Sequence, residues 1–555
     1  GKGVVIDDMQ LEEGDATDYA PRGGIETALS LDAKAYIHDW GDSVPMKVLL
    51  ANTGAEDFDG TLTLRVWDVR EKLVFSKELA APLAPGERDE RVVVLPDTLR
   101  GIFCADLAHG DAVLAERPFT VLPRPRDLDP EKSMLGDHLH YNEFNFWAAR
   151  RLGTRWTRCH DGYTKIFKWW LVEPEPGQWQ FNKPYACSMG CDDAVKLARR
   201  HGIKILGLLD EPPGWAVGMP DRARCRGYYP ENWEAWDRYV RAVVGRYKDY
   251  VDTWELYNEP SNPDKYIELC KRTYPIFKKA NPDARLIGMS STPAAPMCKA
   301  FAKAEGERFL DGISTHIYGW RSKGHLGANF RKIAKMFRKD GEPMPHWMTE
   351  GNLHATWGIF YRSHPRYDHT RRDLRGVPRY LTVARANDVK VVFYYWSNFP
   401  SPRPQDPIGG NGWSFYHHDT AITPAGAAWC VWGRMLDGAE PLATLVDRDE
   451  EVYLFRDGEE LVVAAWAETP RPLDLPAGAF GDGAVCRLFD VMGNEKVLDL
   501  ARPHKMRLDP FMVYFRFRGA EPKAVLDFFR RGLDLPADWK VREHGEAIKE
   551  QEDMR

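Results

Sequence analysis

Two glutamates follow apolar stretches that read as β-strands, in the segments Asn258-Glu259-Pro260 and Thr349-Glu350-Gly351. Pro260 cannot donate to a strand ladder and ends the first strand, so Glu259 is expected at its edge. Gly351 is expected to let the backbone turn sharply after Glu350. Two facing carboxyl groups, one protonated and one ionised, are what cleavage of a glycosidic bond requires. The alternative for Glu259 is an acid that merely caps the next helix, and the alternative for Glu350 is a loop acid without a role.

Further polar and aromatic side chains follow other predicted strands. Arg158 would hold a carboxylate ionised through its guanidinium, unless it pairs with a purely structural acid. His316 and Tyr318 are two residues apart, so both face the same side of a strand, where core packing is the alternative role. Trp396 ends the last predicted strand, where an ordinary core side chain is one possible role. The remaining candidates for contacts with sugar hydroxyls are Asn258, His138, His140, His160 and Asp210.

The elements that must position these residues lie in residues 130–435. Eight apolar segments alternate there with amphipathic helical runs, which is typical of a (β/α)₈ barrel, with a doubly wound sheet as the alternative. Strand ends meet at one rim of a barrel, so Glu259 and Glu350, on the fourth and seventh strands, would share a cleft. Residues 161–190 and 397–423 are long enough to form rim loops. The eight predicted strands are Met134–His140, Thr154–His160, Ile203–Asp210, Val251–Tyr257, Arg285–Ser290, Gly312–Ile317, His346–Glu350 and Val389–Trp396.

Sequences typical of β structure flank the predicted barrel. Residues 1–125 contain short alternating segments separated by turn signals, which predicts an N-terminal, immunoglobulin-like β-sandwich. Strand patterns return in residues 436–519, which predicts a C-terminal β-sandwich, and residues 520–555 are predicted to form a charged helical tail. The expected fold class is therefore α/β: a (β/α)₈ TIM barrel flanked by an N-terminal and a C-terminal β-sandwich.

The composition narrows the choice of partners. The 555 residues include 76 Lys and Arg against 82 Asp and Glu, and a net charge of −6 argues against nucleic acid. No apolar run is long enough for a membrane helix, so no membrane partner is expected. Twenty Trp, 22 Tyr and 25 Phe suit a carbohydrate partner, although much of this aromatic content must be core. Nothing in the sequence indicates the oligomeric state.

Metal ions and cofactors are not expected. The nine cysteines are scattered without the spacing of a zinc site, and they leave the redox compartment open. His138 and His140 could bind a metal, but no matching carboxylate can be assigned. The chain begins Gly1-Lys2-Gly3 without a methionine, which suggests a trimmed start. Removal of a signal peptide would favour a secreted or periplasmic location.

The Asn-Glu-Pro motif ending the fourth predicted strand and the Glu ending the seventh resemble glycoside hydrolase clan A. Within that clan, the pattern is similar to the β-xylosidase and α-L-iduronidase family, family 39, over a little more than half of the chain. The resemblance implies that Glu259 is the acid/base and Glu350 the nucleophile of a retaining mechanism. It also implies that Arg158 lies near the nucleophile, that Tyr318 donates to it, and that Trp396 is a sugar platform.

The implied activity is hydrolysis of β-type glycosidic bonds of an oligo- or polysaccharide by double displacement through a glycosyl-enzyme. A transglycosylase on the same scaffold is one alternative, and a catalytically silent glycan-binding protein is another. An aldolase or a metal-dependent hydrolase would need a Schiff-base lysine or a metal cluster at strand ends, which the sequence does not indicate. The sugar, its linkage and the choice between internal and terminal cleavage are not readable from these motifs.

Overall fold

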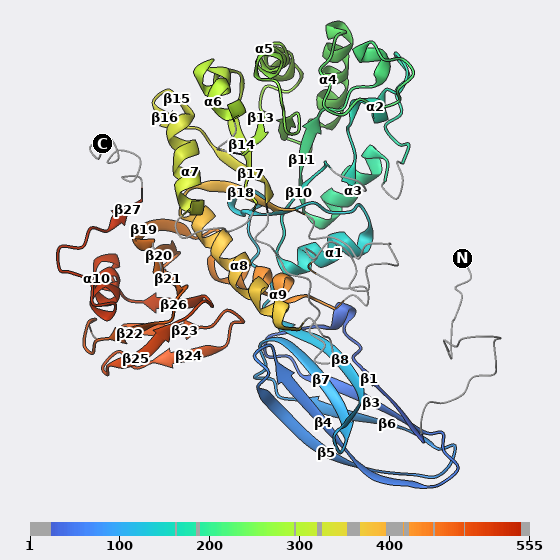
Figure 1. Cartoon of the computed structure of the whole chain (residues 1–555), viewed down its shortest axis with the longest axis vertical. Coiled ribbons are helices and arrows are strands. Elements are labelled where there is room, and N and C mark those ends of the chain that lie inside the picture. The colour runs from blue at the N-terminus through green and yellow to red at the C-terminus, as the bar shows by residue number, and fades with distance from the viewer. Residues whose placement is uncertain are drawn as a thin grey trace. The chain divides into compact units, whose positions relative to one another are not determined.

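The computed structural model describes residues 24–160, 164–184, 189–292, 296–318, 325–351, 367–395, 415, 421–447, 450–481 and 483–544 (Figure 1). The chain divides into two compact units, one formed by the N-terminal strands up to Val121 and one that begins at Leu122. No helix within the described ranges combines the length and the apolar character needed to cross a membrane.

The N-terminal unit is built from two antiparallel sheets that share one hydrophobic core. In β3 (Val44–Asn52) the residues Val44, Met46, Val48 and Leu50 are buried and alternate with more exposed residues, as expected for a strand with one face on a core. One sheet has the order β1–β3–β6 and the other β2–β8–β7–β4–β5. The other strand bounds are β1 Ile25–Ser30, β2 Ile37–Asp39, β4 Phe58–Asp68, β5 Leu73–Leu83, β6 Arg88–Leu95, β7 Gly101–His109 and β8 Ala112–Leu122.

The second unit contains a closed barrel of eight parallel strands in the order β10–β11–β12–β13–β14–β17–β18–β9. Because β18 pairs with β9, the sheet has no free edge, which confirms the predicted (β/α)₈ barrel and excludes the doubly wound sheet. All eight predicted strands are present, several of them shorter than expected. Their bounds are β9 Leu135–Asp137, β10 Trp156–Arg158, β11 Lys204–Leu209, β12 Thr253–Leu256, β13 Arg285–Ser291, β14 Gly312–His316, β17 His346–Gly351 and β18 Val389–Tyr394.

Helices follow the barrel strands along the chain and surround the barrel (Figure 1). Three of them begin at an asparagine whose side-chain oxygen accepts a backbone N–H: Asn142, Asn232 and Asn262. Asn262 lies three residues after Glu259, so the loop carrying this glutamate is short and tied to the helix that follows. The helices are α1 Glu143–Leu152, α2 Trp169–Val172, α3 Cys191–His201, α4 Trp233–Tyr247, α5 Pro263–Ala280, α6 Pro296–Lys303, α7 His325–Met336, α8 Tyr367–Arg385 and α9 Pro424–Leu436.

The C-terminal part of this unit is a seven-stranded sheet with the order β24–β23–β26–β21–β20–β19–β27, joined by the two-stranded sheet β22–β25 and by helix α10 (Pro522–Gly532). These flanking sheets agree with the predicted fold class. Their strands are β19 Glu440–Asp447, β20 Glu450–Asp457, β21 Glu460–Ala467, β22 Arg471–Leu475, β23 Val485–Phe489, β24 Glu495–Leu498, β25 His504–Leu508, β26 Val513–Arg518 and β27 Arg542–Glu543. A short hairpin, β15 (Arg338–Lys339) and β16 (Glu342–Pro343), precedes β17.

Within residues 520–544, the described part of the predicted helical tail, the chain is helical only over α10. Asp534 adopts a left-handed φ of 54°, and Pro536 follows two residues later, so the helix cannot continue. The strand β27 then pairs with Ala443 and Thr444 at the edge of the sheet. Residues 545–555 lie outside the described part of the chain.

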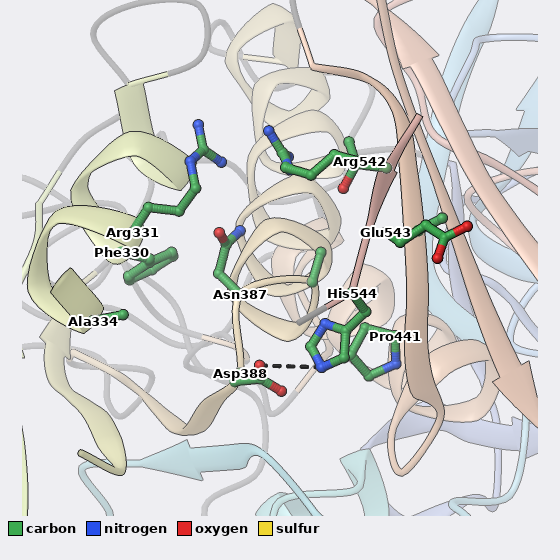
Figure 2. Close-up of a pocket in the computed structure, with 12 residues that line it drawn as sticks. Phe330, Arg331, Ala334, Asn387, Asp388, Pro441, Arg542, Glu543 and His544 are labelled. Carbon is green, nitrogen blue, oxygen red and sulfur yellow. Dashed lines mark ion pairs between the residues drawn. The ribbon is translucent and has the colours of Figure 1, made fainter. Parts of the chain in front are cut away.

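A pocket lies where α7, the turn before β18, and strands β19 and β27 come together (Figure 2). Asp388 and His544 form an ion pair of 3.2 Å at this pocket. Asp388 immediately precedes β18, so the pocket lies at the end of the barrel where the strands begin. Catalytic residues of barrel enzymes gather at the opposite end, where the strands finish.

Candidate active site

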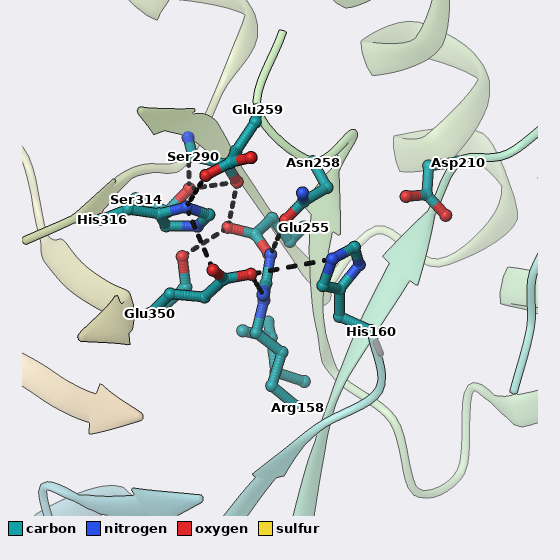
Figure 3. A network of polar contacts seen from close by, with 12 residues as sticks. Arg158, His160, Asp210, Glu255, Asn258, Glu259, Ser290, Ser314, His316 and Glu350 are labelled. Carbon is teal, nitrogen blue, oxygen red and sulfur yellow. Dashed lines mark hydrogen bonds and ion pairs between the residues drawn. The ribbon is translucent and has the colours of Figure 1, made fainter. Parts of the chain in front are cut away.

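The two glutamates predicted to do chemistry meet at the carboxyl ends of β12 and β17 (Figure 3). The Glu350 side chain is 6% exposed and that of Glu259 is 53% exposed. His316, at the end of β14, places its Nδ1 atom 3.1 Å from Oε1 of Glu259 and 3.5 Å from Oε2 of Glu350. One oxygen of each carboxylate lies within 4.8 Å of the other. The structure therefore brings both carboxyl groups to one point.

Glu350 is held as a carboxylate by groups on either side. Arg158 Nη1 donates to Oε1 at 2.6 Å, and the hydroxyl of Tyr318 donates to Oε2 at 2.5 Å. Burial alone would raise the pKa of Glu350. The charges of His316, Arg158 and His138, with the Tyr318 hydrogen bond, lower that pKa to about 2. Glu350 is therefore ionised at neutral pH.

Arg158 connects three acceptors from the interior of the barrel. Its side chain is fully buried, with Nε donating to Oε2 of Glu255 at 2.6 Å and Nη2 donating to Oδ1 of Asn258 at 2.8 Å. With Nη1 on Glu350, the guanidinium is fixed in position and orientation. The Asn258 amide is thereby also oriented at the site.

Glu255 is a member of this network that the sequence reasoning missed. Besides Arg158, its carboxylate accepts hydrogen bonds from Thr349 Oγ1 at 2.8 Å and from Ser290 Oγ. Although burial raises the pKa of Glu255, the charge of Arg158 is the main opposing influence, and the net pKa lies below its ordinary value. A sequence signal existed, because Glu255 is the one charged residue in β12, whose four residues are all buried.

The predicted histidines lie at different distances from the carboxylates. His160 points its Nε2 atom at Oε1 of Glu350 from 3.7 Å. His138 Nε2 lies 3.0 Å from the carbonyl oxygen of Thr349, the residue before the nucleophile candidate, and contacts the ring of Tyr395 edge-on. His140 is buried, which lowers its pKa to about 4. A sugar contact for His140 stays a prediction.

Asp210 follows β11 and faces a buried lysine that the sequence reasoning did not identify. Lys168 Nζ lies 2.6 Å from Asp210 Oδ1, and Lys165 Nζ lies 2.9 Å from Glu211 Oε1. Burial and the neighbouring Glu211 raise the pKa of Asp210, while Lys168 opposes that rise. The ligand atoms of His160, Asp210 and Glu211 are close enough together for a metal, but the two ammonium groups already neutralise these carboxylates.

Gly351 ends β17 without a positive φ, and the sharp turn expected after Glu350 would fall on residues from 352 onwards, outside the described part of the chain. Glycine is needed at position 351 because a Cβ atom would lie 2.4 Å from the carbonyl oxygen of Ile317 and 2.6 Å from the sulfur of Met348.

Trp396, predicted as a sugar platform, lies outside the described residues. Tyr395 before it contacts Tyr318 edge-on, with ring centroids 5.8 Å apart.

Comparison with protein-family models gives no match, and no curated protein matches the chain. Among solved structures, the chain is similar to a family 39 glycoside hydrolase from Bacteroides cellulosilyticus WH2, with a TM-score of 0.65 and 20% identity over 88% of this chain and 99% of the other. Two family 30 xylanases align less well. The enzyme from Clostridium papyrosolvens C71 has a TM-score of 0.46, 13% identity and coverage of 72% and 98%. The enzyme from Clostridium acetobutylicum has a TM-score of 0.45, 12% identity and coverage of 69% and 95%. At these identities the first likeness shows the fold, a barrel with accompanying β structure.

Proposed function

We propose that this chain is a retaining glycoside hydrolase that cleaves β-type glycosidic bonds of an oligo- or polysaccharide. The observation that carries the proposal is the spacing of Glu259 and Glu350, whose nearest oxygens lie within 4.8 Å. Retaining enzymes hold their two carboxyl groups about 5–5.5 Å apart, whereas inverting enzymes leave about 6.5–9.5 Å for a water molecule. The arrangement favours direct attack by a carboxylate on the sugar.

The surroundings of the two groups support a division of roles. Glu350 is buried, ionised and held by Arg158 and Tyr318, as a nucleophile should be. Glu259 is half exposed. Among the described residues, its carboxylate has a hydrogen-bond contact only with Nδ1 of His316, so Glu259 can exchange a proton with water and with a leaving group.

The proposed reaction has two displacements. In the first, Glu350 bonds to the anomeric carbon while Glu259 gives its proton to the departing glycosidic oxygen. In the second, a water molecule gives a proton to Glu259 and its oxygen bonds to the anomeric carbon, which releases Glu350 as a carboxylate. The product keeps the anomeric configuration of the substrate. In this proposal Asn258 binds the hydroxyl next to the anomeric carbon, and its hydrogen bond from Arg158 supports that role by orienting the amide.

The solved structure with a TM-score of 0.65 is that of a glycoside hydrolase, which supports the same reaction class for this chain. Its family does not identify the sugar for this chain. A silent binding protein is disfavoured because both carboxylates and their supporting groups are present. A transglycosylase would use the same residues and differ in whether water or a second sugar accepts the glycosyl group.

The test is hydrolysis of a panel of aryl β-glycosides and natural oligosaccharides, with product anomers followed by NMR. Glu350→Gln should lower turnover by about 10³-fold or more, because no other group can form the covalent intermediate. Glu234→Gln makes the same chemical change at an exposed position of α4 and should leave turnover intact. Near-normal turnover in the Glu350 variant, or an inverted product, would contradict the proposal. Transfer to an added sugar acceptor in preference to water would indicate the transglycosylase.

A further inference from the structure

Lys168 and Asp210 form a buried ion pair next to His160, on the side of its ring that faces away from Glu350. Figure 3 shows His160 between Glu350 and Asp210. Lys168 is fully buried, and its ammonium group lies 2.6 Å from Oδ1 of Asp210. The same ammonium lies 3.3 Å from Nδ1 of His160. A chain of contacts therefore runs from Asp210 through Lys168 and His160 towards Glu350.

The chemistry of an ammonium group determines which ring nitrogen of His160 carries the proton. A lysine ammonium has three N–H donors and no acceptor, so the Nδ1 atom that it faces must present a lone pair. A neutral imidazole then has its only proton on Nε2. This Nε2 atom is the one that faces Oε1 of Glu350, at 3.7 Å, which is longer than a hydrogen bond.

We propose that Lys168 is a positioning residue, held by Asp210, that fixes His160 as the neutral tautomer with its proton on Nε2. Glu350 then meets an N–H dipole rather than a lone pair, which would repel its charge. The inference rests on the proposed function for the role of Glu350 as nucleophile, but the assigned tautomer does not depend on that role.

The surroundings also keep His160 from gaining a second proton. Among the described residues, seven titratable or charged groups lie around it: Lys168, Asp210, Glu211, Arg158, His138, Arg226 and Glu350. Burial foremost, followed by the cations Lys168 and Arg158, lowers the pKa of His160 well below its ordinary value. An imidazolium would form an ion pair with Glu350 and stabilise its negative charge, which would weaken it as a nucleophile. A neutral N–H presents a favourable dipole to the carboxylate without that cost.

The direct test is ¹⁵N NMR of the histidine ring nitrogens in the full chain, with His160→Gln used to assign the His160 signals. The wild type should show His160 protonated on Nε2 at every pH from about 5 to 8, below and above the ordinary pKa of histidine. In Lys168→Met, His160 should populate the other tautomer or begin to titrate. Lys165→Met is the matched control, because it also removes a buried, ion-paired lysine, one that pairs with Glu211, and should leave the His160 tautomer unchanged. Asp210→Asn keeps an acceptor for Lys168 and should also leave the His160 tautomer unchanged.

Activity supplies the second measurement. Lys168→Met should lower kcat by about 10–100-fold with a smaller change in KM, as expected when an oriented group near the nucleophile is lost. A wild-type spectrum with the proton on Nδ1 would overturn the inference whatever the activity, and it needs no variant that might misfold. The inference also fails if Lys168→Met folds and leaves both tautomer and kcat unchanged. If the wild type hydrolyses no glycoside but shows the Nε2 proton, the proposed function fails and the tautomer assignment stands.

Discussion

The hydroxyl of Tyr318 is the most accessible of the groups that keep Glu350 ionised. The residue is 41% exposed, so Tyr318→Phe should remove the hydrogen bond without disturbing the fold. A hydrogen bond to a charged group contributes about 1.5–3 kcal/mol, which corresponds to roughly 1–2 pKa units. The pKa of Glu350, about 2 in the intact site, should rise by that amount. The acid limb of kcat/KM should then move to higher pH, and activity at pH 3 should fall severalfold relative to pH 6.

The pH dependence of stability should change in the same variant. A carboxylate with a lowered pKa stabilises the fold above its unfolded value, near 4.5, and this contribution disappears as the pH falls towards about 2. In Tyr318→Phe the pKa of Glu350 is lowered less, so this carboxylate contributes less stability at every pH above about 3. Acid unfolding, followed by circular dichroism, should therefore begin at a higher pH. Coincident acid limbs of kcat/KM for wild type and variant would show that Tyr318 does not support the ionised state of Glu350.

At the end of β17, Gly351 directly after Glu350 lies very close to the backbone that follows β14. A Cβ atom on Gly351 would meet the Ile317 carbonyl oxygen at 2.4 Å, and a backbone atom cannot move aside as a flexible side chain could. Gly351→Ala should cost about 1–3 kcal/mol of unfolding free energy and shift Glu350 away from Arg158. The unfolding temperature and kcat should both fall. Gly245→Ala, on helix α4 with no atom within 4 Å of the added Cβ, is the control and should lower neither. An alanine variant at 351 with normal kcat would contradict this view of the strand end.

The sequence was most informative about elements whose position follows from local rules. Apolar segments of strand length alternate with helices, and this pattern predicts Glu259, Glu350, Arg158 and His316 at strand ends. The close contacts among these four side chains support that prediction of their positions. Pro260 is expected to end the strand, but β12 already ends at Leu256, where Tyr257 takes a positive φ of 66°. Roles in catalysis stay predictions until activity is measured.

Lys165 and Lys168 could not be found by the same reasoning. They lie in the loop after β10, where no periodic pattern indicates which way a side chain points, and lysines are usually exposed. Their burial depends on Asp210 and Glu211, more than 40 residues later in the chain. Pairings of this kind follow from tertiary structure, which a single sequence does not reveal.

Within the second unit, the C-terminal sheet covers apolar surface of the barrel helices. Helix α9 is buried at nearly every position, and Trp432 donates to Thr382 on α8, whose hydroxyl also contacts the sulfur of Met512 near β26. Arg379 of α8 stacks over Trp466 of β21 and pairs with Glu468. The barrel and the C-terminal sheet should therefore unfold as one cooperative body.

Truncation after Gly438 should consequently yield an aggregated barrel rather than a soluble enzyme, because the apolar faces of α8 and α9 would be left exposed. Soluble yield and size-exclusion chromatography measure this outcome. Co-expression of residues 439–555 as a separate chain should restore soluble protein if the interface is what was missing. A soluble, monomeric and active truncated chain would show that the sheet is dispensable.

The backbone at Glu259 places function and global stability in conflict. Glu259 has a φ of 50°, a left-handed conformation that costs a non-glycine residue about 1 kcal/mol or more. Glu305 has nearly the same φ, 52°, but lies on the exposed surface before a short helix. Glu259→Gly and Glu305→Gly should both raise the unfolding temperature, while only the first abolishes turnover. A selection for thermal stability alone would therefore discard the proposed acid/base, and directed evolution of this chain must screen for catalysis at every round.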